Sequence, residues 1–326
     1  MSRAMVDTTV LKNAVELACR APSLHNSQPW RWVAVGTVLD LFADPSRIGH
    51  FTDSTGREVI ISCGAVLDHL RVAMAAAGWE ASIERLPDPD NRDHLAAIQF
   101  DRSESVDEAQ RVLAEAIRRR RTDRLAFAAP EPWEPVESVL RAAAATGSVD
   151  LDVIDDDGRP ALADASRRTE QMRAHDSSYQ AELLWWTGYS EPEEGIPPSA
   201  LASDAEATRV DVARSFPRSG DEDRRADVDR DHSRIVVLST YDDSRDNALR
   251  AGEVLSTLLL ECTAAGLATC TLTHMMEVNA SRELVRRLVG RVAEPQVLIR
   301  VGRAPESAAP PPRTPRRPLA DVLQIR

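Results

Sequence analysis

The nine residues Pro22-Ser23-Leu24-His25-Asn26-Ser27-Gln28-Pro29-Trp30 separate two elements of different period. Apolar residues at helical spacing predict a helix over 10–21 before them, and 30–35 has the composition of a strand. A helix end followed by a turn explains Pro22 and Ser23, because proline cannot continue a helix. It does not explain the whole nine-residue pattern, so we expect this loop to carry function as well as structure.

Helices and strands continue in both directions from this loop. The apolar periodicities predict an α+β fold of four further strands and five further helices. The expected strands are 96–100, 149–154, 235–240 and 296–301, and the expected helices are 56–78, 106–121, 136–146, 161–189 and 246–265.

One internal similarity indicates a tandem duplication. A shift of 188 residues places 64–78 on 252–266, with seven of fifteen positions identical. Shared Leu and Ala positions are common between helices. The glycines Gly64/Gly252 and Gly78/Gly266 are more informative, since Gly costs about 1 kcal/mol inside a helix.

Two segments have no helical or strand period. Residues 190–232 are rich in Pro, Gly and mixed charge, and a loop of that length within a compact domain is usually functional or disordered. The segment 305–318 contains six prolines and is expected to be extended.

Composition excludes several classes of function. The net charge of −12 argues against a nucleic-acid partner, although 118–121 is a run of four arginines. The single lysine, Lys12, lies outside any Walker A sequence and near the exposed start of a helix, which disfavours ATPase and pyridoxal-phosphate chemistry. There is no G-x-G-x-x-G and no G-x-S-x-G sequence.

The sequence also gives no sign of export, membrane insertion or a metal site. Polar residues interrupt every apolar stretch near the N-terminus, and no apolar run approaches the ~18–20 residues of a membrane span. The four cysteines show no C-x-x-C spacing, so neither a zinc site nor a disulfide framework is indicated. We expect a cytoplasmic protein.

The loop at 22–30, written P-S-x-x-N-x-Q-P-W, resembles the flavin-facing loop of the nitroreductase family. The resemblance implies an FMN site that includes Pro22, Ser23, Leu24, Asn26 and Gln28. In the family, the Pro-Ser backbone lies against the isoalloxazine ring.

Three further segments resemble nitroreductase elements in the order expected. Arg120-Arg121-Thr122-Asp123-Arg124 is similar to the family's R-R-S-x-R, which implies phosphate contacts from Arg120 and Thr122 and a ring contact from Arg124. One extra residue before Phe127 departs from the family pattern. The cationic groups suit a phosphate and the charge that develops at N1 on reduction. Gly266–His274 resembles the family's G-L-G-T-x, which implies that backbone groups of Thr273 and His274 lie near flavin N5 and O4. Arg316-Arg317-Pro318-Leu319 resembles the family's R-x-P-L, which implies that Arg316 completes the phosphate site.

His274 has two interpretations. It could act as an acid or base, but a lone histidine is more often a polar residue at a core boundary. The resemblance requires no catalytic side chain, because the flavin N5 carries the chemistry.

The order of these elements predicts one complete site per chain. The first half, 1–105, holds the 22–30 loop, and the second half, 106–326, holds the other three elements. This arrangement resembles the dormancy-associated actinobacterial Acg group of the family, in which one chain mimics the family homodimer. It implies a monomer in which 190–232 is a lid over the flavin.

Three functions remain open at this point. The first is an NAD(P)H-dependent FMN oxidoreductase that acts on nitroaromatics or quinones. The second is an FMN-sequestering or storage protein whose lid prevents turnover. The third, a structural protein without flavin, is disfavoured by the four ordered elements.

Overall fold

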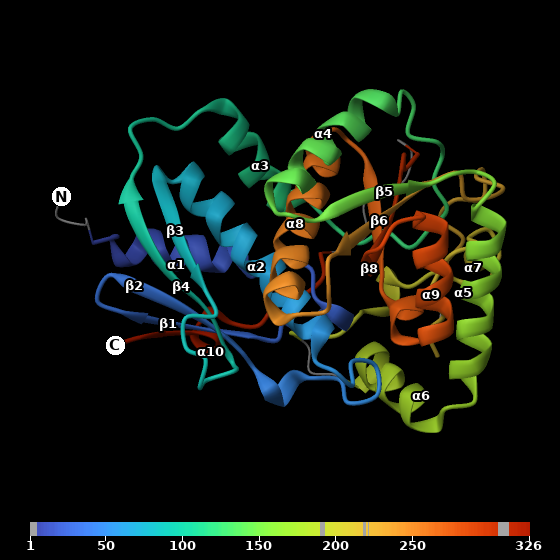
Figure 1. Cartoon of the computed structure of the whole chain (residues 1–326), viewed down its shortest axis with the longest axis horizontal. Coiled ribbons are helices and arrows are strands. Elements are labelled where there is room, and N and C mark those ends of the chain that lie inside the picture. The colour runs from blue at the N-terminus through green and yellow to red at the C-terminus, as the bar shows by residue number, and fades with distance from the viewer. Residues whose placement is uncertain (1–4, 190–192, 218–219, 221, 306–312) are drawn as a thin grey trace.

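The computed structural model describes residues 5–189, 193–217, 220, 222–305 and 313–326. Residues 190–192, 218–219 and 221 of the expected lid lie outside the described residues, as do 306–312 of the proline-rich segment. The described residues form two β-sheets with helices between and around them (Figure 1).

The first sheet has the strand order β3-β4-β2-β1-β9. Its strands are β1 (Trp30–Val35), β2 (Val38–Ala43), β3 (Trp79–Arg85), β4 (His94–Arg102) and β9 (Leu323–Ile325). The pairings β1/β2, β2/β4 and β3/β4 are antiparallel, whereas β9 runs parallel to β1. The end of the chain therefore completes the sheet that its beginning forms.

The second sheet has the order β5-β6-β8-β7, with antiparallel pairing throughout. It consists of β5 (Asp150–Ile154), β6 (Arg234–Thr240), β7 (Ala268–Leu272) and β8 (Glu294–Gly302). The described α-helices are α1 (Thr8–Ala18), α2 (Arg57–Ala76), α3 (Glu108–Arg119), α4 (Glu134–Thr146), α5 (Arg159–Ala174), α6 (Ser177–Leu184), α7 (Asp204–Ala207), α8 (Arg245–Ala264), α9 (Asn279–Val289) and α10 (Leu319–Val322). The mixed α and β composition predicted from the sequence is confirmed.

The two 20-residue helices α2 and α8 lie between the sheets (Figure 1) and pack extensively against each other. They cross at Gly64 and Gly252, the pair that the shift of 188 places together. A Cβ atom on Gly64 would lie 2.1 Å from the Leu249 carbonyl oxygen, and one on Gly252 would lie 2.0 Å from that of Ile61. Both positions therefore need glycine because backbone approaches backbone, which explains why glycine is tolerated inside these helices.

The predicted helix over 161–189 is wrong as a single element. Helix α5 ends at Ala174, and α6 begins at Ser177 after the cap residue Asp176, whose carboxylate accepts a hydrogen bond from the Tyr179 backbone N–H at 3.1 Å. The residues 185–189 form a π-helical turn. An aspartate that caps a new helix competes with continuation of the old one, and apolar periodicity alone does not show this.

One helix tests the expectation that no apolar segment is long enough to span a membrane. Helix α2 is long and apolar enough to span a membrane by length and composition, but 83% of the relevant window is buried inside the protein. It packs against α1, α3, α8 and strands β2 and β3 of the first sheet, so the helix is a core element of the fold.

Candidate functional site

The 22–28 loop is held against the N-terminal part of α2. The Leu24 backbone N–H donates to the Ser62 hydroxyl at 3.1 Å, and the Gln28 backbone N–H donates to the Ser23 hydroxyl at 3.0 Å. His25, Asn26 and Gln28 have positive φ values of 50°, 57° and 50°. Non-glycine residues at positive φ are uncommon and often mark functional loops.

Two cavities meet at this loop. The larger, about 590 Å³, is lined by the predicted residues Pro22, Ser23, Leu24, Thr122, Arg124 and Thr273, together with many residues of the 193–216 segment. The smaller, about 410 Å³, is lined by the predicted residues Ser23, Asn26, Arg120, Thr122, Arg124 and Arg316. Because Ser23, Thr122, Arg124 and Ile196 line both, we treat the two cavities as one continuous cleft.

The smaller cavity, called the arginine cavity below, concentrates positive charge. Its lining contains eight arginines, and none of its described lining residues is acidic: Arg20, Arg118, Arg119, Arg120, Arg121, Arg124, Arg313 and Arg316. Burial and the charge of Arg20 lower the pKa of Arg120 to about 10. Burial and the charges of Arg120 and Arg20 lower the pKa of Arg316 to about 9. These guanidinium groups lack a counter-charge that an anionic ligand would supply.

Arg316 and Arg120 differ in how their donors are used. Arg316 donates to the carbonyl oxygens of Cys19, Arg20 and Ala21 at 2.9, 3.0 and 3.3 Å, just beyond the end of α1. Its remaining terminal nitrogen donates to the carbonyl oxygens of Thr314 and Pro315. The Nε atom of Arg120 is buried without a partner among the described residues. Arg120 therefore has a free donor, whereas Arg316 holds the C-terminal segment against α1.

Of the remaining predicted residues, some line the cleft and others contact the segments that line it. Thr122 forms a bridge beside Thr269 of β7, which brings the arginine run against the second sheet. Gln28 is fully buried and lines neither cavity; its amide nitrogen donates to Glu193 O at 2.8 Å, and its Oε1 accepts from Arg317 N at 2.8 Å. The His274 side chain also lies outside the lining, with Nε2 2.9 Å from the Ser166 hydroxyl, and burial lowers its pKa well below the usual value.

The described part of the insertion 190–232 lines the larger cavity. Ile196, Leu201, Ala202, Val210 and Phe216 contribute apolar lining. The Asn26 amide donates to Gly195 O at 3.0 Å, and Arg124 donates to Ala200 O at 3.0 Å. Two of the residues predicted to contact a ligand are thus also contacts of the insertion.

Arg214 connects the insertion to several other parts of the chain. Its guanidinium forms an ion pair with Glu277, donates to Tyr179 Oη at 3.1 Å and Thr273 Oγ1 at 3.3 Å, and lies 3.0 Å from His25 Nε2. Although burial disfavours its charge, Glu277 and Tyr179 raise the pKa of Arg214 further. One side chain therefore joins the insertion to the 22–28 loop, to α6 and to the segment after β7.

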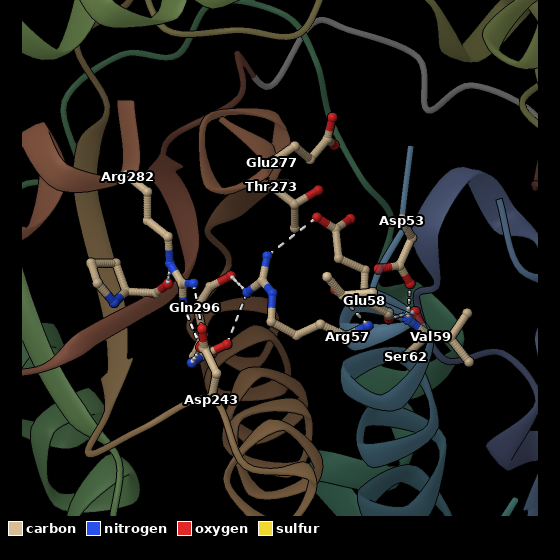
Figure 2. A network of polar contacts seen from close by, with 12 residues as sticks. Asp53, Arg57, Glu58, Val59, Ser62, Asp243, Thr273, Glu277, Arg282 and Gln296 are labelled. Atoms are coloured by element: carbon tan, nitrogen blue, oxygen red, sulfur yellow. Dashed lines mark hydrogen bonds and ion pairs between the residues drawn. The ribbon is translucent and has the colours of Figure 1, made fainter. Parts of the chain in front are cut away.

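A carboxyl group at the start of α2 also faces this region. Burial and the neighbouring Glu277 charge raise the pKa of Glu58 to about 8. Figure 2 shows Glu58 in contact with Arg57, whose guanidinium continues to the Gln296 side chain at 2.8 Å. Gln296 in turn donates to Asp243 at 2.8 Å, and Asp243 pairs with Arg282. This network ties the cavity wall on α2 to β8 and α9.

Sequence reasoning missed several residues of the cleft. Arg20, Glu58, Arg214 and Phe216 belong to its lining. Arg214 and Phe216 lie in the irregular insertion, where no periodicity indicates which side chain points inward. Arg20 lies two residues before the 22–30 pattern, and this position near the loop is the one signal that the sequence offers. Within the described residues, no group of three or more His, Cys, Asp or Glu side chains is arranged to hold a metal ion.

The cleft suits a ligand with two unlike ends. An anionic group would fit the arginine cavity, and a larger uncharged group would fit between the 22–24 loop, Thr273 and the insertion. Both parts are accessible to one molecule because the cavities share lining residues.

Comparison with known proteins gives full-length relatives. No family model matches the chain. It is 55% identical over 326 residues to the Mycobacterium tuberculosis protein named "Putative NAD(P)H nitroreductase acg", covering 100% of this chain and 98% of the relative. A second M. tuberculosis protein with an NAD(P)H nitroreductase name is 39% identical over 321 residues, covering 98% of this chain and 92% of the relative.

Solved nitroreductase structures align more distantly. The FMN-dependent nitroreductase NfnB from Mycobacterium smegmatis, in complex with NADPH, is 17% identical and covers 67% of this chain and 99% of its own, with a TM-score of 0.40. A nitroreductase from Anabaena variabilis is 11% identical and covers 90% of this chain and 73% of its own, with a TM-score of 0.42.

Proposed function

The chain belongs to the nitroreductase family, within the group of the mycobacterial Acg protein, and from this premise we propose that it binds FMN in the cleft. The observation that carries the proposal is the arginine cavity, where eight arginines meet no described acidic lining residue. A phosphate monoester supplies the missing negative charge and accepts several charge-assisted hydrogen bonds.

The orientation of FMN follows from the two ends of the cleft. Its phosphate would lie with Arg120 and Thr122, and its ring would lie in the larger cavity against Pro22, Ser23 and Leu24. Bound FMN supplies hydride and electron transfer, and the protein contributes position and electrostatics. Arg124 lines both cavities and would face the ring, and Thr273 would lie at its other edge.

Three residues implied by the family resemblance are assigned as positioning residues. Gln28 fixes the backbone at Glu193 and Arg317, and Arg316 fixes the end of α1. The side chain of His274 lies away from the lining, so its contribution to FMN would come from its backbone N–H, as the resemblance implies.

We further propose that the chain is a fused duplication with one FMN site per monomer. The crossing of α2 and α8 at Gly64 and Gly252 supports this, because the residues that the repeat superimposes meet at the centre of the molecule. The boundary would fall near 105/106. Light scattering with flavin quantitation tests the proposal, and a dimer that shares one flavin between two chains would refute both the monomer and the single-chain site.

The activity that the family supports is oxidation of NAD(P)H by the flavin, with electrons passed to a nitroaromatic or quinone. Such a reaction needs access for the nicotinamide and then for a small aromatic acceptor to one face of the ring. The larger cavity, about 590 Å³, lies where these molecules would enter.

A second candidate function, FMN sequestration, is favoured by the insertion. The contacts of Arg214, Asn26 and Arg124 hold the insertion over the larger cavity, so residues 190–232 would act as a lid that excludes the nicotinamide. Both functions require FMN, and they differ in whether the lid opens on the time scale of turnover.

One experiment separates the two functions. The absorbance of the purified chain shows whether flavin is bound, and NADPH is then added without oxygen. Reduction of the intact chain supports the oxidoreductase. Reduction only after residues 193–231 are replaced by a short Gly/Ser linker supports sequestration, provided that the variant retains FMN. If dithionite but not NADPH bleaches both forms, the oxidoreductase proposal fails.

A further inference from the structure

The arginine cavity holds more positive charge than one FMN phosphate requires. Elsewhere in the described chain, buried arginines are matched by acids, as in the pairs Arg225–Asp123 and Arg300–Asp231. Among the described residues, Arg118 of the arginine cavity forms an ion pair with Glu115, which lies on the exposed face of α3. The cavity is thus an exception in a chain whose net charge is −12.

The helix ends nearby compensate only part of this charge. Arg20 follows the end of α1, and Arg118, Arg119 and Arg120 occupy the last turn and cap of α3. Two helix C-termini together contribute roughly one negative charge, and a phosphate monoester contributes about two more. Eight guanidinium groups would therefore retain about five positive charges with FMN bound.

The surplus charge lies on the outer side of the cavity. Arg20, Arg118, Arg313 and Arg316 also line a neighbouring cavity of about 550 Å³, whose lining adds Arg317 and one acidic residue, Glu16. Arg20 has a buried Nε atom without a partner among the described residues, and burial with the charges of Arg313 and Arg118 lowers its pKa. The positive charges of Arg20, Arg118 and Arg313 therefore lie close together, and Arg20 keeps a donor for a ligand.

We propose that Arg20, Arg118 and Arg313 bind a second phosphoryl group, next to but separate from the phosphate of FMN. This inference rests on the proposed FMN site. The second group could be carried by a nucleotide or be free phosphate, since both present the same oxygen acceptors to arginine. Arg120 and Thr122 remain with FMN, so the two phosphoryl groups occupy adjacent parts of one cationic channel.

The test uses the full chain loaded with FMN and three probes: inorganic phosphate, ADP and adenosine. Calorimetry measures probe binding, and flavin fluorescence shows whether FMN stays bound. We expect phosphate and ADP to bind saturably without releasing FMN, and adenosine to bind neither site. Much tighter binding of ADP identifies a nucleotide as the source, and equal affinities identify free phosphate.

Variants locate the site. Arg20→Gln and Arg313→Gln should each weaken ADP or phosphate binding about tenfold, the lower range for a charged hydrogen bond. Arg313 is exposed, so its variant tests the site even if Arg20→Gln destabilises the fold. Arg111→Gln is the matched control, because Arg111 lies on α3 like Arg118 and pairs with Glu108 as Arg118 pairs with Glu115.

Three results would overturn the inference while leaving FMN binding intact. They are no probe binding to the FMN-loaded chain, release of FMN as the probe binds, or equal weakening by Arg111→Gln. A chain that cannot be loaded with FMN would instead refute the proposed function, and this inference with it.

Discussion

Buried arginines at the two ends of the cleft have opposite electrostatic surroundings. Over the larger cavity, Arg214 is matched by Glu277 and Tyr179, which raise its pKa despite burial. In the arginine cavity, burial and neighbouring arginines lower the pKa of Arg120 to about 10 and that of Arg316 to about 9. Arg214 thus has a counter-charge within the protein, whereas no described acidic residue lines the cavity of Arg120 and Arg316. The difference favours an anionic ligand in the arginine cavity, and it supports the proposal that Arg214 holds the insertion over the larger cavity.

The largest expected effect comes from Arg214→Met. Removing one partner of a buried ion pair costs about 3–5 kcal/mol, because the other charge stays buried. Since Arg214 joins the insertion to three other elements, we expect the cost to appear mainly as local opening of the insertion. Limited proteolysis should cut 193–232 much faster in the variant than in the native chain.

Arg209→Met is the control for that experiment. Arg209 lies in the same insertion and pairs with Asp223 near the surface. Its replacement should leave the proteolysis rate much closer to native. Equal rates for Arg214→Met and the native chain would show that Arg214 does not hold the insertion closed.

The next largest effect concerns the arginine cavity. If Arg120 binds the FMN phosphate, Arg120→Gln removes a charge-assisted contact of about 1.5–3 kcal/mol, or ~10- to 150-fold in affinity. Riboflavin, which lacks the phosphate, should lose little. Fluorescence titration of both flavins measures the ratio, with Arg111→Gln as a control of equal charge. A parallel loss for FMN and riboflavin would place the phosphate elsewhere.

Sequence order identified segments that the fold brings together. The 22–30 loop, the arginine run at the end of α3 and the C-terminal Arg316 line one cleft, and their role in binding FMN stays a prediction. The β1 strand was placed correctly at 30–35. Short motifs can be located in this way because each is a segment whose backbone is fixed by its neighbours.

The sequence could not predict which acceptors the arginine side chains bind in the folded chain. Arg316 was expected at the phosphate, yet its donors go to carbonyl oxygens around the end of α1, 295–297 residues away. Arg214 gave no signal, because its partners Tyr179, Thr273 and Glu277 come from separate elements. Such contacts depend on tertiary packing, which neither period nor composition encodes.

A smaller effect should appear as a pH dependence of the covered end. The pKa of Glu58 is raised to about 8 from an ordinary value of 4.5 by burial and by Glu277. Between these values the folded chain holds a proton that the unfolded chain has released. The contribution of Glu58 to stability is therefore fully present below its ordinary pKa and is lost as pH rises through about 8, by on the order of 1–2 kcal/mol between pH 6 and 8.

Urea unfolding at pH 6 and 8 measures this change. Glu58→Gln keeps the shape of the protonated group and removes its titration, so the difference between the two pH values should shrink. The exposed Glu115→Gln on α3 should leave the difference as it is in the native chain. An unchanged pH difference in Glu58→Gln would mean that another group, such as Glu277, carries the proton.

The smallest expected effect is that of salt, which should weaken FMN binding in the arginine cavity but leave the contacts of Arg214 unchanged. Raising ionic strength from 0.1 to 1 M shortens the Debye length from ~10 to ~3 Å, which screens charges that solvent can reach. The arginine cavity has the exposed rim residues Arg118, Arg119 and Arg313, so FMN affinity should fall roughly a few-fold. Arg214 and Glu277 have side chains only 7% and 5% exposed, so the proteolysis rate of the insertion should hardly change. Riboflavin affinity, measured in the same salt series, should also stay constant because no phosphate is involved. If FMN and riboflavin weaken together, or if the insertion opens in parallel, the two ends are coupled and the contrast between them does not hold.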